Sequence, residues 1–203
     1  MHLSTSIALA LTLVAGQTAG QTVPDARQLY DAGKYKEVVA ALDKTPVDAD
    51  KASRLQYLAA QSDERLKDTV AARRLYQRLA DGGETSWGAI GKSAVQLIDK
   101  KPDEALVSAN DAVRLGASLP EAQYQRGIVL MTRKEYDDAA GAFTKATQLD
   151  PTFAAAYYYA GLADSRIKRT DLMTNNFEKF IKLAPNAPER PEVESILRTV
   201  RGH

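Results

Sequence analysis

Few side chains in this sequence could carry out catalysis. It contains no cysteine and two histidines, His2 and His203. Thiolate nucleophiles, disulfides and cysteine metal sites are therefore excluded. Between positions 2 and 203 there is also no histidine that could act as a general base or metal ligand. We expect no metal site and no cofactor.

Pairs of acidic residues are the remaining candidates for acid–base chemistry. They occur at Asp63-Glu64, Asp103-Glu104 and Asp137-Asp138. Each pair lies near an expected turn or helix start, where the helix dipole and water stabilise a carboxylate. No phosphate-binding loop, serine-hydrolase elbow or zinc-binding His motif accompanies them. The sequence therefore predicts a protein that is not an enzyme.

The charge balance bears on the class of partner. There are 27 Lys and Arg against 26 Asp and Glu, a formal net charge of +1, and no dense basic run. This pattern gives no electrostatic footprint for nucleic acid. Hydrophobic residues make up 44% of the chain, enough for a folded core.

An apolar run at residues 7–15 is typical of an export signal. It is shorter than the roughly 20 apolar residues that span a membrane, and small residues follow it. We predict a signal peptide over residues 1–20, with cleavage after Gly20; cleavage after Ala15 or Gly16 is the alternative. The segment before the run lacks Lys and Arg, so a frayed helix or an uncleaved anchor is the competing interpretation. The prediction implies a periplasmic or secreted protein with no integral membrane span after cleavage.

The rest of the sequence repeats with a period of about 34 residues. Small residues recur in one series and mostly larger apolar residues in another, with steps of 33 or 34. A small residue lets two antiparallel helices approach closely, and a large one fills the space beneath the next pair. The small series is Ala26, Ala60, Ser93, Gly127 and Gly161, and the apolar series is Leu42, Tyr76, Ala109, Phe143 and Phe177.

Two copies of the repeat carry the clearest pattern. The copy at 120–151 has Gly127, Tyr136, Ala139, Phe143, Ala146 and Pro151, and the copy at 154–185 has Tyr157, Gly161, Phe177 and Pro185. In these residues the sequence resembles the tetratricopeptide-repeat (TPR) family. It departs from that family's pattern at Gln123, where Trp is usual, and at Lys134, where a turn glycine is usual.

The resemblance implies an all-α fold. The expected architecture is a right-handed α-α superhelix, a TPR-like solenoid of about five helix pairs, followed by a C-terminal capping helix over 189–201. The solenoid would occupy residues 21–203. Its repeats would be 24–50, 53–84, 86–117, 120–151 and 154–185.

In the TPR family the concave groove commonly receives peptides or helices. The register assigns groove positions to Arg54, Tyr57, Gln61, Arg65, Trp87, Tyr124, Ile128, Tyr158, Leu162 and Arg166, with Glu64 and Ala94 as neighbours. Tyr and Arg are frequent anchors of protein recognition, but tyrosines at these positions also suit packing between helix pairs. The Lys and Asn set with which some TPR proteins hold a C-terminal carboxylate does not occur.

These observations predict a non-enzymatic scaffold that binds a protein or peptide. With the export signal, the expected setting is the extracytoplasmic space and the expected task is assistance to an envelope assembly. The alternative is a structural or oligomerising module with no groove ligand. The sequence does not determine the oligomeric state.

Overall fold

A computed structural model of the chain describes residues 25–42 and 49–202. The predicted signal peptide and its cleavage site lie outside these ranges, so export remains a prediction. Within the described ranges every regular element is an α-helix, and the helices pack in consecutive pairs. The predicted fold class, an all-α TPR-like solenoid, is confirmed.

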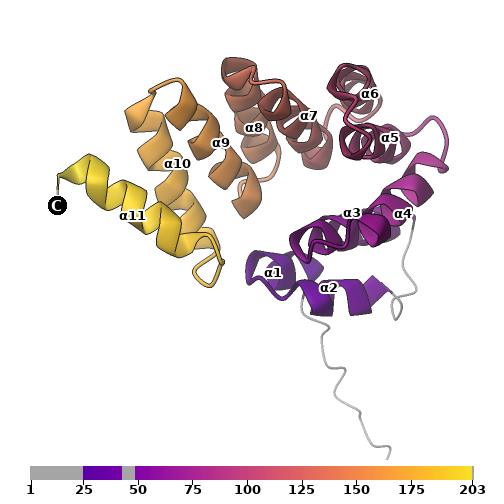
Figure 1. Cartoon of the computed structure of the whole chain (residues 1–203), viewed down its shortest axis with the longest axis horizontal. Helices are drawn as coiled ribbons and strands as arrows, with labels where there is room; N and C mark the ends of the chain where they lie inside the picture. The colour runs from indigo at the N-terminus through magenta and orange to yellow at the C-terminus, as the bar shows by residue number, and fades with distance from the viewer. Residues whose placement is uncertain (1–24, 43–48, 203) are drawn as a thin grey trace, which may run out of the picture.

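Each pair consists of a first helix, a short turn and a second helix (Figure 1). The first helices are α1 (Ala26–Asp31), α3 (Ala49–Arg65), α5 (Ser86–Ile98), α7 (Pro120–Thr132) and α9 (Ala154–Arg166). The second helices are α2 (Tyr35–Leu42), α4 (Thr69–Ala80), α6 (Pro102–Leu115), α8 (Tyr136–Leu149) and α10 (Thr170–Leu183). A final helix, α11 (Arg190–Arg201), packs on α10.

One helix begins earlier than the sequence indicated. Helix α3 starts at Ala49, whereas the second repeat was predicted to start at about residue 53. Asp50 lies in the first turn of α3, where a carboxylate favours the helix N-terminus. Its Oδ1 also accepts a hydrogen bond of 2.7 Å from the indole nitrogen of Trp87, which ties this extra turn to α5.

The turn inside each helix pair uses the same backbone device. One residue has a left-handed conformation, with φ of 72° at Gly33 and between 59° and 65° at Lys67, Lys100, Lys134 and Lys168. The amide after it donates back into the first helix, as Glu135 does to the carbonyl of Leu130 at 2.9 Å. This arrangement satisfies carbonyls at the helix end, a role that glycine fills most easily.

Glycines in the first helices allow the second helices to approach closely. A Cβ atom at Gly127 would lie 2.5 Å from Cε1 of Phe143, and one at Gly161 would lie 2.6 Å from Phe177. Both phenylalanines are fully buried. In each of these hairpins a glycine of the small series contacts a phenylalanine of the apolar series. This contact determines how closely the two helices of the hairpin pack.

The solenoid curves until its two ends meet. Helices α5 to α10 form an arch, and α1 lies beside the connection between α10 and α11 (Figure 1). A Cβ at Gly33 would be 2.7 Å from Cγ of Pro188, and Arg65 Nη1 lies 2.6 Å from Glu189 Oε1. The first helices of the pairs face the inside of this curve.

The lengths and compositions of the helices also bear on membrane insertion. In residues 25–42 and 49–202, no helix combines the length and the apolar character that a bilayer crossing requires.

Candidate functional site: the central cavity

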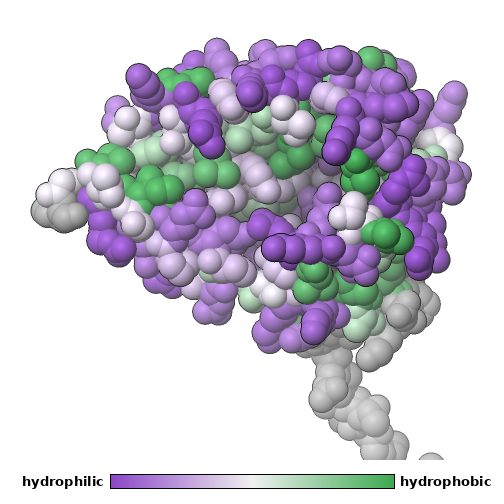
Figure 2. Space-filling model, in the orientation of Figure 1, coloured by the Kyte–Doolittle hydropathy of each residue, from purple (hydrophilic) through white to green (hydrophobic). Residues whose placement is uncertain are grey.

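A cavity of about 300 Å³ lies on the concave side of the solenoid. Figure 2 shows this face, with a recess in which green and pale residues lie inside a largely purple rim. Side chains from α1, α3, α4, α5, α7 and α9 form its wall. We call this the central cavity; it is lined by Tyr30, Gln61, Glu64, Arg65, Tyr76, Ala94, Leu97, Tyr124, Gln125, Ile128 and Tyr159.

Glu64 is the acidic residue of the cavity wall. Its Oε2 accepts a hydrogen bond of 2.8 Å from the hydroxyl of Tyr76. Glu64 is accessible to solvent, but surrounding protein raises the pKa of its carboxyl by desolvation, against smaller opposing effects of the Tyr76 hydrogen bond and the charge of Arg65. No Lys or Arg in the described part of the chain forms an ion pair with this carboxylate.

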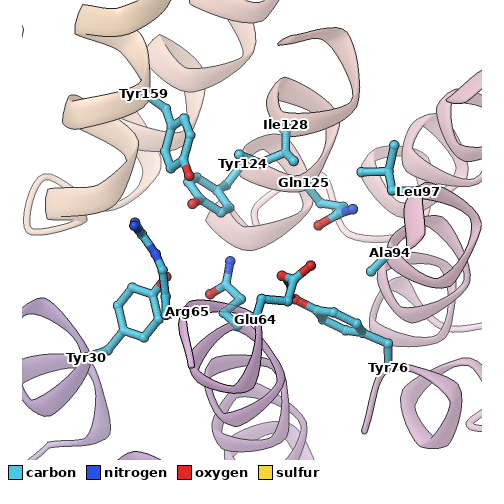
Figure 3. Close-up of a pocket in the computed structure, with 11 residues that line it drawn as sticks. Tyr30, Glu64, Arg65, Tyr76, Ala94, Leu97, Tyr124, Gln125, Ile128 and Tyr159 are labelled. Atoms are coloured by element: carbon cyan, nitrogen blue, oxygen red, sulfur yellow. Dashed lines mark hydrogen bonds between the residues drawn. The ribbon is translucent and has the colours of Figure 1, made fainter. Parts of the chain in front are cut away.

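Arg65, the basic residue of the wall, is already engaged. It pairs with Glu189 at 2.6 Å, and its positive charge lies close enough to the Tyr30 phenol to oppose the rise that burial causes in the pKa of that group. Figure 3 shows its guanidinium turned to the side of the cavity where Tyr30 and Tyr159 lie. Arg65 therefore joins the two ends of the solenoid at one edge of the cavity.

A buried hydrogen-bond chain fixes Gln125 in the wall. The hydroxyl of Tyr57 donates to Gln125 Oε1 at 2.9 Å, and Gln125 Nε2 donates to Ser93 Oγ at 3.2 Å. Ser93 donates in turn to the carbonyl of Ala105 at 3.0 Å. Because buried polar groups are costly when unpaired, this chain holds α3, α5 and α7 in one arrangement.

A second polar cluster holds the N-terminal helices against α7. Glu121, which is 1% exposed, accepts from Arg27 Nη2 at 2.8 Å and from Arg54 Nε at 2.9 Å, both at Oε1. The guanidinium carbon of Arg27 also lies 3.9 Å from the ring centroid of Phe153, a cation–π geometry. Glu121 thereby connects α1 and α3 to the middle of the solenoid.

Four of the ten predicted groove residues line the central cavity: Gln61, Arg65, Tyr124 and Ile128. Tyr57 and Trp87 are instead buried, 1% and 8% exposed, with ring centroids 6.0 Å apart. Their polar atoms bond inside the protein, to Gln125 and Asp50. In this structure both residues pack the core rather than line the cavity.

The other four predicted residues lie outside the central cavity. Arg54 is bonded to Glu121. Tyr158 lines a small neighbouring pocket and packs on Phe180, with ring centroids 5.2 Å apart. Leu162 packs against the C-terminal apolar cluster, and Arg166 is exposed at the end of α9.

Five residues of the cavity wall were not predicted as groove residues: Tyr30, Tyr76, Leu97, Gln125 and Tyr159. Tyr159 takes the place expected for its neighbour Tyr158, and its ring packs edge-on against that of Tyr124. The register gave a signal for Gln125 and Tyr159, since both directly follow predicted groove tyrosines. Tyr30 also had a signal, since it stands 34 residues before Glu64, a groove neighbour in the same register.

Comparison with known proteins agrees with this architecture. Residues 120–153 match the tetratricopeptide repeat family. TTC0263 from Thermus thermophilus, a TPR protein, superposes with a TM-score of 0.61 at 18% identity, covering 88% of this chain and 96% of its own. No curated protein sequence matches the chain.

Two further solved structures are similar. YrrB, described as a TPR protein with an unusual peptide-binding site, has a TM-score of 0.53 at 22% identity, covering 84% of this chain and 88% of its own. The first TPR domain of Spaghetti (RPAP3), solved with an HSP90 peptide, has a TM-score of 0.53 at 19% identity, covering 58% of this chain and 94% of its own. The chain therefore has the tetratricopeptide-repeat fold, with one repeat, residues 120–153, that matches the family directly.

Proposed function

We propose that this protein is a non-enzymatic scaffold that binds a peptide segment of another protein in its central cavity. The observation that carries the proposal is the cavity itself. Helices from five repeats converge on it, and its wall combines apolar side chains with fixed polar groups. Such a combination is typical of ligand sites, where apolar surface gives affinity and a few polar groups give specificity.

The similar proteins support a peptide as the ligand. TPR folds commonly mediate protein or peptide binding, and two of the similar structures are described with a peptide or a peptide-binding site. TPR scaffolds are also generally non-enzymatic. In this chain no cysteine is present, and the two histidines are at positions 2 and 203.

We further propose that the protein works outside the cytoplasm, in assistance to an envelope assembly. The apolar run at residues 7–15, with small residues before position 21, supports export. Expression of the full chain in a bacterium and N-terminal sequencing of the product tests this. A periplasmic or secreted product that begins at Gln21 is expected. A cytoplasmic product that retains residues 1–20 contradicts export.

Selection of peptides from a random 12-residue display library, with the purified chain as bait, tests the binding function. Selected peptides should bind the parent chain and lose affinity for Ile128→Trp, which fills the cavity. Val107→Trp is the matched control, because Val107 is 65% exposed on α6 and does not line the cavity. Equal affinity for both variants, or no selected peptide at all, contradicts the proposal.

A further inference from the structure

The central cavity contains one carboxylate, that of Glu64, which forms no ion pair within the described residues. Glu64 and Arg65 are its charged lining residues. Arg65 is paired with Glu189 at 2.6 Å, whereas in the described part of the chain Glu64 has no ion pair and accepts a hydrogen bond from Tyr76. A partly desolvated carboxylate with free acceptor capacity is stabilised by a cationic donor.

An apolar surface lies beside this carboxylate. Ala94 and Leu97 from α5 and Ile128 from α7 line the cavity together with Glu64. Figure 3 shows the Glu64 carboxylate near the middle, Ala94 and Leu97 on one side, and Arg65 with Tyr30 and Tyr159 on the other. A guest in this space meets apolar side chains along part of its length and a carboxylate near its tip.

The size and the aromatic content of the cavity further limit which ligand groups it can hold. About 300 Å³ is at the lower end of ligand pockets, which span roughly 300–1,000 Å³, so the cavity suits one long side chain rather than a helix. Four tyrosines contribute to the wall, and two of them, Tyr124 and Tyr159, have ring centroids 5.7 Å apart. The faces of aromatic rings attract cations.

We infer that the central cavity takes a Lys or Arg side chain of the bound peptide. The ammonium or guanidinium group bonds to Glu64, and the aliphatic stem packs on Ala94, Leu97 and Ile128. An acidic side chain is repelled by Glu64, and a wholly apolar one removes water from the carboxylate without replacing its hydrogen bonds. This inference rests on the proposed peptide-binding function and specifies what the site recognises.

A double-mutant cycle between the chain and the selected peptides tests the inference. Each Lys or Arg of a selected peptide is replaced in turn by norleucine, which keeps an aliphatic stem and removes the charge. Affinities are measured by calorimetry for the parent chain, for Glu64→Gln and for Glu104→Gln. Glutamine at position 64 retains an acceptor for Tyr76, and Glu104 is an exposed acidic residue on α6 that serves as the matched control.

For one Lys or Arg, norleucine should weaken binding to the parent chain and to Glu104→Gln by about 10-fold or more, the usual effect of a charged hydrogen bond. With Glu64→Gln the same replacement should change the affinity by less than about 3-fold, because the charge partner is gone. The inference is overturned if the selected peptides contain no Lys or Arg with this effect, or if norleucine weakens binding to Glu64→Gln as much as to the parent chain. In either case, loss of peptide affinity in Ile128→Trp would still support the proposed peptide-binding function. If putrescine displaces the peptide at a concentration equal to the peptide's dissociation constant, the site binds free amines. That result overturns the inference as well.

Discussion

Arg27 and Glu121 are 94 residues apart in the sequence, yet Arg27 Nη2 lies 2.8 Å from Glu121 Oε1. This contact fixes the short helix α1 on the inside of the curve, where Tyr30 becomes part of the cavity wall. Helix α1 has six residues, too few to be stable by itself in water. Its place in the molecule therefore depends on contacts of this kind.

Replacement Glu121→Ala should destabilise the protein by about 3 kcal/mol, the lower end of the range for breaking a buried pair. Arg27 and Arg54 lose their shortest ion pair and keep only longer ones, with Asp150 at 3.9 Å and Asp50 at 4.0 Å. Denaturant unfolding followed by Trp87 fluorescence measures the loss. Hydrogen exchange should accelerate in α1 more than in α8. Glu104→Ala is the control: it removes an exposed pair with Lys101 and should cost less than about 1 kcal/mol. Equal costs for the two variants contradict the anchoring role of Glu121.

Gly127 and Gly141 give a matched pair for the close approach of α7 and α8. A methyl group at Gly127 meets the ring of Phe143 at 2.5 Å, whereas one at Gly141 meets nothing within 4 Å. Gly127→Ala should lower the free energy of unfolding by about 1–3 kcal/mol through overpacking. Gly141→Ala should raise it by about 0.5–1 kcal/mol, because alanine is the better helix former. Thermal melts of both variants measure these changes, and a neutral Gly127→Ala contradicts the packing.

The turn lysines carry backbone strain that glycine would relieve. Lys134 has a φ of 65°, in the left-handed region that disfavours a side chain. Lys134→Gly should therefore stabilise the protein by about 1 kcal/mol. Lys145→Gly, in the exposed middle of α8, should destabilise it by about 1 kcal/mol, since glycine is a poor helix former. Opposite signs in a calorimetric melt support the turn geometry; a loss in both variants contradicts it.

Stability should depend on pH through Asp31 at the end of α1. Desolvation, aided by Asp25, Asp150 and Glu189 and opposed by Arg27, raises the pKa of Asp31 from 3.8 to about 6. A raised acid pKa means that the folded state binds the proton more tightly, so this group lowers stability as pH rises from about 4 to about 6. Asp31→Asn should leave the melting temperature nearly unchanged at pH 4 and raise it at pH 7. The same difference at both pH values contradicts the shift.

The hairpins could be predicted from sequence because their physics is local and periodic. Gly127 and Gly161, Phe143 and Phe177, and Pro151 and Pro185 each recur after 34 residues. The glycines allow two helices to pack closely, the phenylalanines fill the space between them, and the prolines mark the ends of the second helices. The fold class follows from this repetition together with the resemblance to the TPR family, and the structure confirms it.

The wall of the cavity was less predictable, since it depends on how the hairpins accumulate curvature. The register placed Tyr57 in the groove, but its hydroxyl reaches Gln125 in the core. Tyr76 was predicted to pack, and its ring is buried, but its hydroxyl reaches Glu64 in the cavity. Tyr30 lies one period before Glu64, and it comes close to Arg65 because the adjacent first helices α1 and α3 pack on each other.

Photo-crosslinking can show whether a partner peptide lies in the central cavity. A diazirine analogue of leucine, which is close to isoleucine in size and leaves the cavity open, is introduced at Ile128, in the cavity wall, and separately at Val107, on the exposed side of α6. A selected peptide is added and irradiated, and the products are mapped by mass spectrometry. We expect a crosslink from position 128 and none from position 107. A crosslink from position 107 alone, or from neither position when the peptide binds, contradicts binding in the cavity.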